Sequence, residues 1–443
     1  HSYLQLRLNN GGAATQLLSP DLGCPMIQRL RIESGGVTIE DINEYGKLYA
    51  MMMLHQCPED YVSNTCGNYG LCPSLGSIAP TVANQTIRPS THGATDTHLT
   101  GKPLPGINPL CNLKEFGAGV THGGVRVATN GANQPGASGI LNAERTGPIV
   151  PGGGRVYTIP LLSGFLNQDK YLPLIMMNAG FTIEIHLAPA NAIGQTRVEA
   201  SAAANIAAPI ASVWTIDQVQ YVAQLIDLDR EFYGKLRSVM ESSGGVLQLA
   251  GQTYRQYSGV IGNAQGEYTL SLPARVKSIK SIFATFIQQA QRNVAANYSV
   301  SVGQNAGITA FRFEIGSVRY PQTDVRVQGN SKAEAMAELH KAFGKLGDYS
   351  HSNCVRPWHL DNDDDAVTDA VAQNRGSYFM LGYDFEAFQK VALESGINTA
   401  DRSLPINFVV NHAAVGGDVH ADFFVLSDAI YYINLDGTVS VSV

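Results

Sequence analysis

The side chains in this sequence that could do acid–base chemistry are a few scattered histidines and carboxylates. His412, His420 and Asp422 flank the Gly416-Gly417 pair and could converge. One such trio is a weak signal, and we interpret these residues as part of a loop. The sequence contains neither His-x-His nor His-Glu-x-x-His. That absence argues against cupin and zinc-protease metal sites, which need two ligands on one strand or one helix face.

The densest acidic cluster is formed by Asp361, Asp363 and Asp365, which follow the first three ligand positions of a calcium loop. Ala366 stands where that loop needs glycine, and Ala372 stands where it needs glutamate, so the EF-hand pattern is broken. A looser calcium site between strands is the alternative. We interpret the cluster as a solvated acidic loop.

The cysteines do not form a metal-binding or redox motif. The sequence has no Cys-x-x-Cys pair, and His55 is the only histidine near the group around Cys66. A metal site in that group is the alternative. We interpret all six cysteines as free thiols in a reducing compartment; they are Cys24, Cys57, Cys66, Cys72, Cys111 and Cys354.

Other motifs of catalysis and ligand binding are missing as well. No Gly-Lys pair is followed by Ser or Thr, and no Gly-x-Ser-x-Gly occurs, which excludes a P-loop and a nucleophile elbow. Arg275, Lys277 and Lys280 lack interleaved aromatic residues, so they indicate a solvated face. His186 lies opposite an apolar stripe and is expected at a surface or interface. We therefore predict no enzyme activity and no catalytic, cofactor-binding or metal site.

The composition points to a protein that buries its outer surface against other chains. Charged residues are 15% of the sequence, against about 25% in average globular proteins. The net charge of −7 disfavours general attraction to nucleic acid or to anionic membranes. No apolar run of about 18 residues predicts a transmembrane helix. The first residues lack the pattern of a secretory leader, and because the sequence starts with His1, we expect that amino-terminal sequence is missing or removed.

Short β-segments bounded by Gly, Pro and Asn dominate the sequence. Residues 4–8 and 181–187 alternate strictly between apolar and polar side chains. Asn434-Leu435-Asp436-Gly437 has hairpin-turn chemistry. Further strands are predicted at 26–32, 37–40, 155–159, 213–226, 268–272, 276–286, 311–315, 378–383, 406–410, 423–426, 429–433 and 438–443.

Three helices interrupt the strands. Asp41 is expected to cap one that carries Tyr45 and Leu48, and Asp229 to cap a second that ends at Gly244-Gly245. The third is predicted over 331–346. The stretches 57–154 and 188–212 show little periodicity, and we expect long surface loops there. We interpret 57–154 as an outward tower or as an arm that reaches a neighbouring subunit.

An internal repeat sets the expected architecture. The segment that starts at Ser163-Gly164 and the segment that starts at Ser395-Gly396 share six features in register, among them an Asp, a basic residue and a Leu-Pro pair. Such repeats indicate two similar units in tandem. We predict an all-β fold of two eight-stranded antiparallel sandwiches, with a few short helices and long surface loops. The expected domains are 1–228, including an insert at about 57–154, and 229–443.

The order of these features resembles the double jelly-roll major capsid proteins of virophages, polinton-like viruses and adintoviruses, and more distantly those of large DNA viruses of eukaryotes. The resemblance rests on residues 26–40 with the following helix, 163–187, 313–321 with its helix, and 395–443. It implies two tandem jelly rolls and a homotrimer whose pseudo-hexagonal capsomers tile an icosahedral shell. It also implies neighbouring capsomers, penton and minor capsid proteins as partners, and a location in the virion after assembly inside the host cell.

Two other functions stay open from the residues alone. A carbohydrate-active or carbohydrate-binding tandem β-sandwich would use paired carboxylates, for which Glu184 and Glu314 are candidates. A non-catalytic extracellular adhesin would use the sequons at Asn84 and Asn297. A stable trimer or particle would favour the capsid hypothesis over both.

Overall fold

The structure is a computed structural model of the full chain, with no bound ligand or partner chain. It describes residues 2–11, 15–17, 26–56, 152–167, 170–188, 196–198, 214–242, 244–292, 305, 307–327, 332–347, 379–386, 395–400 and 404–443, together with four two-residue strands. These short strands are β5 (Thr121–His122), β6 (Val125–Arg126), β7 (Thr129–Asn130) and β8 (Gln134–Pro135). The cysteines, both sequons and Asp361, Asp363 and Asp365 lie outside the described residues.

The second half of the chain forms a sandwich of two antiparallel sheets, which we call the second roll. One sheet has the order β13-β20-β15-β18, with β21 paired to β20, and the other has the order β14-β19-β16-β17. The strands are β13 (Val246–Ile261), β14 (Gly266–Leu272), β15 (Ile279–Gln288), β16 (Ile308–Ile315), β17 (Val318–Arg326), β18 (Leu381–Asp384), β19 (Ile406–His412), β20 (Val419–Asn434) and β21 (Val439–Ser442).

The first half, which we call the first roll, has two three-stranded antiparallel sheets among its described residues. Their orders are β12-β1-β9 and β10-β3-β4, and a short β2–β11 pair lies apart from both. The strands are β1 (Ser2–Asn10), β2 (Thr15–Leu17), β3 (Ile27–Ser34), β4 (Val37–Asn43), β9 (Gly154–Ile159), β10 (Thr182–Leu187), β11 (Thr196–Val198) and β12 (Trp214–Ala223).

Every strand pairing in the two main sheets of the first roll has a counterpart in the second roll. The order β12-β1-β9 matches β20-β15-β18, and the order β10-β3-β4 matches β19-β16-β17. In both rolls a helix follows the β-hairpin: α1 (Tyr45–Gln56) follows β4, and α5 (Lys332–Ala342) follows β17. Ser163 lies between β9 and β10, and Ser395 lies between their counterparts β18 and β19. The two repeat segments therefore occupy equivalent places.

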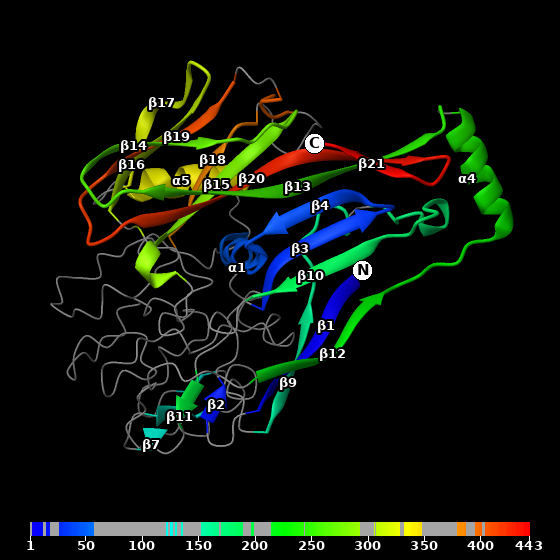
Figure 1. The fold of residues 1–443 in the computed structure, drawn as a ribbon, viewed down its shortest axis with the longest axis horizontal. Helices are drawn as coiled ribbons and strands as arrows, with labels where there is room; N and C mark the ends of the chain where they lie inside the picture. The colour runs from blue at the N-terminus through cyan, green and yellow to red at the C-terminus, as the bar shows by residue number, and fades with distance from the viewer. Residues whose placement is uncertain are drawn as a thin grey trace.

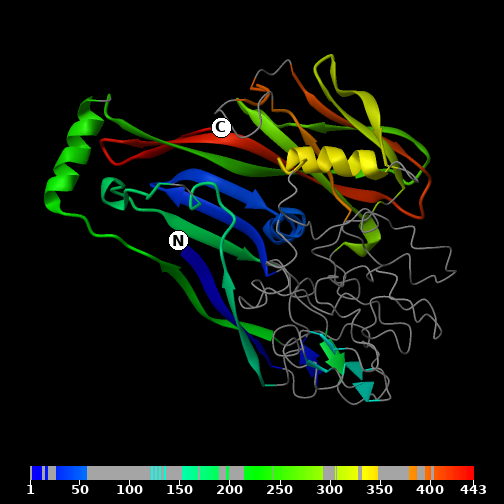
Figure 2. The ribbon, with the colours of Figure 1, turned by 180° about the vertical axis from the view of Figure 1, so that it is seen from behind.

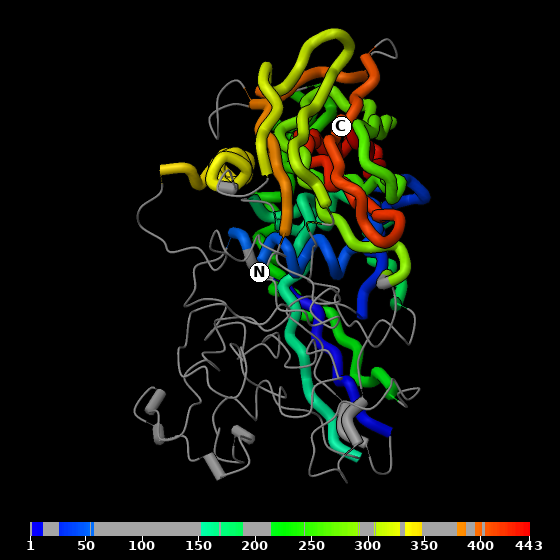
Figure 3. The backbone as a smooth tube through the Cα atoms, turned by 90° about the vertical axis from the view of Figure 1, so that its left-hand side faces the viewer, coloured from blue at the N-terminus to red at the C-terminus, as the bar shows by residue number. Residues whose placement is uncertain are grey.

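The four sheets are stacked in layers. Figures 1 and 2 show the β14-β19-β16-β17 sheet on the outside, then the β13-β20-β15-β18 sheet, then β10-β3-β4, and last β12-β1-β9. Figure 3 shows the same order from the side. Strand β15 lies in the middle of this stack, and its residues from Ile279 to Ile287 are all buried. Both faces of the strand are therefore covered, and the covered residues include the polar side chains Lys280, Ser281 and Thr285.

The helices largely agree with the sequence, with one correction. Helix α4 (Arg230–Ser242) follows Asp229, whose carbonyl accepts the Phe232 N–H, and ends before Gly244-Gly245, which have positive φ. The expected cap at Asp41 is wrong. Asp41 lies within β4, where both carboxylate oxygens bond to Arg29 at 2.7 and 2.5 Å, and α1 begins only at Tyr45. Two 3-10 turns, Leu174–Met176 and Gln289–Gln291, complete the described elements.

Candidate functional site: the joint between the rolls

The two rolls meet along an apolar cluster to which both contribute. We call this contact, together with the polar groups beside it, the joint. Phe165 packs against Tyr431 with ring centroids 5.3 Å apart, edge to face, an arrangement that favours aromatic pairs. The buried members from the first roll are Ile32, Ile39, Phe165 and Met177, and those from the second roll are Leu249, Ala429, Tyr431, Ile433 and Val439.

The Ser163-Gly164 repeat segment docks directly onto the second roll. A Cβ at Gly164 would lie 1.4 Å from the carbonyl oxygen of Gln252 in β13, so only glycine fits this approach. Ser163 Oγ hydrogen-bonds to Glu40, and the Gly164 N–H donates to Glu40 Oε1 at 3.0 Å. Thr253 Oγ1, from the second roll, donates to the same oxygen at 3.0 Å. Glu40 therefore collects hydrogen bonds from both rolls.

Glu40 is buried, with 2% of its surface exposed, and no cation contacts it among the described residues. Burial raises its pKa, although the hydrogen bonds from Ser163, Gly164 and Thr253 favour the ionised form. Burial and the Glu40 charge also raise the pKa of Tyr254 and of Tyr431. An ionised Glu40 is therefore costly at this position, because no cation in the described part of the chain neutralises its charge.

A second set of polar contacts crosses the joint, and here the buried negative charge is paired with a positive one. Lys47 Nζ, from α1, lies 2.7 Å from Asp422 Oδ2 in β20, and both side chains are buried. Gln256 Nε2 donates to Asp422 Oδ1 at 2.9 Å, and His420 Nε2 lies 3.0 Å from that oxygen. Burial alone would raise the pKa of Asp422, but the Lys47 charge and the His420 hydrogen bond hold it well below its ordinary value.

A third contact closes the joint near its edge. Arg292 Nη2, from the second roll, lies 2.8 Å from Glu44 Oε1, which directly precedes α1, and both side chains are partly buried. Glu44 has a φ of 50°, a backbone conformation that side chains other than glycine rarely adopt. The chain thus turns sharply between β4 and α1, and the Glu44 side chain bonds to the opposite roll.

The equivalent Ser395-Gly396 segment docks within its own roll. A Cβ at Gly396 would lie 2.1 Å from the carbonyl oxygen of Ile279, and Ser395 Oγ donates to Glu386 Oε1 at 2.8 Å. Here the carboxylates have a cation, because Lys280 Nζ lies 2.8 Å from Glu386 and 3.3 Å from Asp428. The repeated segment therefore anchors on a carboxylate in both rolls, but only in the first roll does it join two rolls.

Lys280 corrects one expectation from the sequence. Arg275 and Lys277 are exposed, as a solvated face requires, but Lys280 is 6% exposed and lies between the buried carboxylate of Asp428 and the partly buried carboxylate of Glu386. The Glu386 hydrogen bond and the Asp428 charge raise its pKa although burial opposes them. The basic group is therefore partly structural.

The three residues around Gly416-Gly417 do not form one site. His420 and Asp422 meet inside β20, where both are buried, rather than in a loop. His412 ends β19 and instead contacts the carbonyl oxygen of Ala264 at 3.2 Å. His420 and Asp422 are part of the joint, because Asp422 pairs with Lys47.

The two candidate glycosidase carboxylates lie in different rolls, and each is paired with arginine. Glu184, in β10, lies 3.5 Å from Arg31, and His186 lies 3.8 Å from Glu184 with half of its side chain exposed. Glu314, in β16, belongs to a separate network. A glycosidase needs two carboxylates that face each other across one cleft. Glu184 and Glu314 are not placed in that way.

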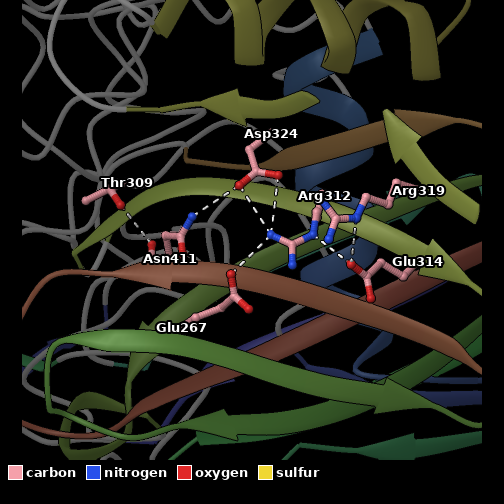
Figure 4. A network of polar contacts seen from close by, with 7 residues as sticks. All are labelled: Glu267, Thr309, Arg312, Glu314, Arg319, Asp324 and Asn411. Atoms are coloured by element: carbon pink, nitrogen blue, oxygen red, sulfur yellow. Dashed lines mark hydrogen bonds and ion pairs between the residues drawn. The ribbon is translucent and has the colours of Figure 1, made fainter. Parts of the chain in front are cut away.

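The network around Glu314 lies on the β14-β19-β16-β17 sheet and is centred on Arg312 (Figure 4). Arg312 Nε lies 2.8 Å from Glu314, and its Nη1 lies 3.2 Å from both Glu267 and Asp324. Asn411 donates to Asp324 at 3.3 Å. The carboxylates raise the pKa of Arg312 although burial opposes them. The guanidinium thereby ties β16 to β14 and to β17, and Asn411 extends the network to β19.

Apolar side chains stay exposed beside α4. Figure 1 shows this helix at one end of the molecule, apart from α1 and α5. Its charges are paired along the helix, Glu231 with Lys235 and Arg237 with Glu241. The exposed apolar residues there are Leu225, Ile226, Leu228, Phe232 and Val239, with exposed fractions between 43% and 75%.

The described residues contain no group of three or more His, Cys, Asp or Glu side chains arranged to hold a metal ion. In the same part of the chain, no helix has the length and apolar character needed to cross a membrane.

Comparison with solved structures shows which known fold the chain shares. PBCV-1 VP54, as fitted into a cryo-EM reconstruction of the virophage Sputnik, aligns over 100% of this chain and 89% of its own, with 9% identity and a TM-score of 0.50. The chain is a double jelly-roll protein. The Faustovirus major capsid protein aligns over 98% of this chain and 77% of its own, with 12% identity and a TM-score of 0.48. No family model and no curated protein matches the sequence.

The double jelly-roll fold confirms the predicted all-β class with two tandem antiparallel rolls. At this identity the likeness concerns the fold alone.

The joint was missed from the sequence, although one signal for it exists: Lys47 is a single charged residue within an apolar helix, YGKLYAMMM. A lysine in such a position needs a buried partner.

Proposed function

We propose that this double jelly-roll protein is a major capsid protein that assembles into trimers and, through them, into an icosahedral shell. The observation that carries the proposal is the fold itself, two rolls stacked in tandem as in PBCV-1 VP54, a structure that has been fitted into a virophage particle. In such a shell each chain would supply two rolls to a pseudo-hexagonal block. Neighbouring capsomers, penton and minor capsid proteins are the proposed partners.

The joint supports this role because a shell component must hold its two rolls in a fixed relation. Lys47–Asp422 and the Glu40 hydrogen bonds couple residues that are distant in the sequence, and the apolar cluster lies beside them. We place the boundary between the rolls at α4, in line with the expected division into 1–228 and 229–443. The insert at 57–154 is proposed as a tower or arm of the same particle.

Assembly also requires surfaces that single chains leave uncovered. The low charged fraction of the sequence and the exposed apolar residues around α4 fit a protein that buries area against copies of itself. We therefore propose that Phe232 and its exposed neighbours contact another copy in the trimer. The proposed activity is self-assembly, without catalysis, in the virion after assembly inside the host cell.

Mass photometry of the purified chain tests this proposal together with two variants. Phe232→Asp should reduce the trimer fraction at least about tenfold, because a charge in an apolar interface must be desolvated. Val260→Asp is the matched control, since Val260 is 51% exposed on β13, away from α4. It should leave the trimer intact. Equal trimer fractions in all three proteins would remove α4 from the interface, and monomers throughout would contradict the capsid role.

A further inference from the structure

The cluster around Lys280 differs from an ordinary ion pair, because one amine faces two carboxylates from different parts of the chain. Lys280 Nζ, in β15, lies 2.8 Å from Oε1 of Glu386, which follows β18, and 3.3 Å from Oδ1 of Asp428, in β20. At most 11% of each of the three side chains is exposed. Burial of charged groups costs free energy even when they are paired. A reaction that removed one positive and one negative charge would therefore relieve part of that cost.

The backbone holds the three side chains at close range. The Phe385 N–H donates to the carbonyl oxygen of Lys280 at 2.7 Å, and the Asp428 N–H donates to the carbonyl oxygen of Ser278 at 3.1 Å. Phe385 and Ala429, which are the chain neighbours of the two carboxylates, are buried. Groups that are held in fixed positions react as if their concentration were very high.

Two serine hydroxyls give the carboxylates different roles. Ser278 Oγ donates to Asp428 Oδ2 at 2.7 Å, and Oδ1 is the oxygen nearest the amine. A hydrogen bond on Oδ2 would stabilise the negative charge that an attack on Cγ places there. Ser395 Oγ donates at 2.8 Å to Glu386 Oε1, the oxygen beside the amine. Asp428 is thus placed to be attacked, and Glu386 is placed to carry protons.

We propose that Lys280 and Asp428 form an amide bond between their side chains, which links β15 covalently to β20. Glu386 first takes a proton from the ammonium, which leaves the amine nucleophilic. Nζ then bonds to Cγ of Asp428, and the bond from Cγ to Oδ1 breaks. One hydrogen of the ammonium stays on the amide nitrogen. Glu386 passes the other two in turn to Oδ1, which leaves as water.

This step is balanced within the cluster. Glu386 ends in the protonation state in which it began, and no oxidant, reductant or cofactor takes part. The ammonium and one carboxylate are replaced by a neutral amide, which lowers the number of buried charges. The reaction occurs once in each chain and turns over no substrate. The inference does not depend on the capsid role.

Lys47 provides a comparison inside the same chain. Its Nζ lies 2.7 Å from Asp422, and both side chains are buried. Among the described residues, however, Lys47 faces this single carboxylate and lacks a second one to carry protons. Lys47 should therefore keep a free amine although its partner is as close as the partners of Lys280.

Intact-mass spectrometry of the folded, purified chain, recorded after denaturation, tests the link. The wild-type chain should be lighter than its sequence by the mass of one water molecule. Digestion should give a branched peptide that joins the segments around Lys280 and Asp428. Lys280→Met and Asp428→Ala should each abolish the mass loss. Lys277→Met is the matched control and should retain it, because Lys277 is exposed and bonds to Ser442 Oγ.

Glu386→Gln tests the proton carrier, and it stays informative if a variant at Lys280 or Asp428 fails to fold. Glutamine keeps the shape of the side chain but cannot accept the amine proton, so the link should form at least about a hundredfold more slowly. The linked fraction is followed over time after expression is stopped.

Four results would overturn the proposal. The first is a folded wild-type chain that has the full mass of its sequence. The second is a link from Lys280 to Glu386 in place of Asp428. The third is a link in Glu386→Gln that forms at the wild-type rate, and the fourth is an equal link between Lys47 and Asp422, since either would remove the role given to Glu386.

Discussion

Lys47 Nζ in the first roll and Asp422 Oδ2 in the second roll lie 2.7 Å apart, with both side chains buried. Removing the lysine would leave a buried carboxylate without its cation. Lys47→Met should therefore lower the free energy of unfolding by about 3–5 kcal/mol. Lys47→Met combined with Asp422→Leu should recover much of that loss, because the unpaired charge is gone.

The control for this pair is Lys235→Met, which removes an exposed lysine 2.7 Å from Glu231 on α4. Exposed pairs contribute at most about 1 kcal/mol, so its denaturant midpoint should barely move. Urea titrations of the four proteins check the set. A Lys47→Met protein as stable as wild type would mean that the joint does not depend on this contact.

Gly164 should not tolerate a side chain. Its Cβ position lies 1.4 Å from the Gln252 carbonyl oxygen, and the backbone of β13 is held by β20 along its length. Gly164→Ala should cost at least about 1–3 kcal/mol, the usual range for overpacking. Gly417→Ala is the control, because no atom lies within 4 Å of its Cβ position. Thermal unfolding of both variants decides the matter, and equal midpoints would show that the rolls do not meet at Gly164.

Glu40 and Asp422 should give the joint opposite pH dependences. Burial raises the pKa of Glu40, so its contribution is most favourable below the ordinary glutamate pKa and is lost as pH rises through the folded value. The pKa of Asp422 is lowered, so its contribution is present above the ordinary aspartate pKa and is lost as pH falls.

Glu40→Gln should flatten the alkaline side of a plot of unfolding free energy against pH, and Asp422→Asn should flatten the acid side. Urea midpoints collected at intervals between about pH 3 and 9 would give both curves. If Glu40→Gln steepens the loss of stability with rising pH, then Glu40 acts as a stabilised anion, and the interpretation of a costly charge is wrong.

Arg312 ties Glu267, Glu314 and Asp324 together across the outer sheet of the second roll (Figure 4). Arg312→Met should destabilise the protein by about 1.5–3 kcal/mol, the range for hydrogen bonds to charged groups. Arg319→Met, at an arginine with 59% of its side chain exposed and 3.4 Å from Glu314, should have less than about a third of that effect. Calorimetry would measure the stability of both variants. An equal loss of stability in the two would contradict the central place of Arg312 in the network.

The repeat and the alternating strands could be predicted from the sequence because they follow local patterns. Phe181 to Leu187 alternates as a strand should, and Ser163 and Ser395 mark equivalent places. Strand β13 was not predicted. Two of its polar residues, Thr253 and Gln256, bond to Glu40 and to Asp422 at the joint, so their polarity does not mark a loop.

The partners of the buried and partly buried charges could not be predicted, because none of them lies in the same local segment of the sequence. Asp41 was expected to start a helix, but the partner of that carboxylate is Arg29 across a hairpin, which extends the strand. Lys280 looked solvated beside Arg275 and Lys277, yet Asp428 and Glu386 come from segments more than a hundred residues later. Local spacing carries no information on such contacts.

Assembly of the purified chain tests the central claim most directly. Mass photometry across dilution and salt should give a species of three times the 47.4 kDa of one chain. That species should survive dilution if folding and association are coupled, and added salt should weaken it little, because screening acts mainly on exposed charges. A folded monomer at micromolar concentration, with no particles in any buffer, would contradict the proposed capsid role.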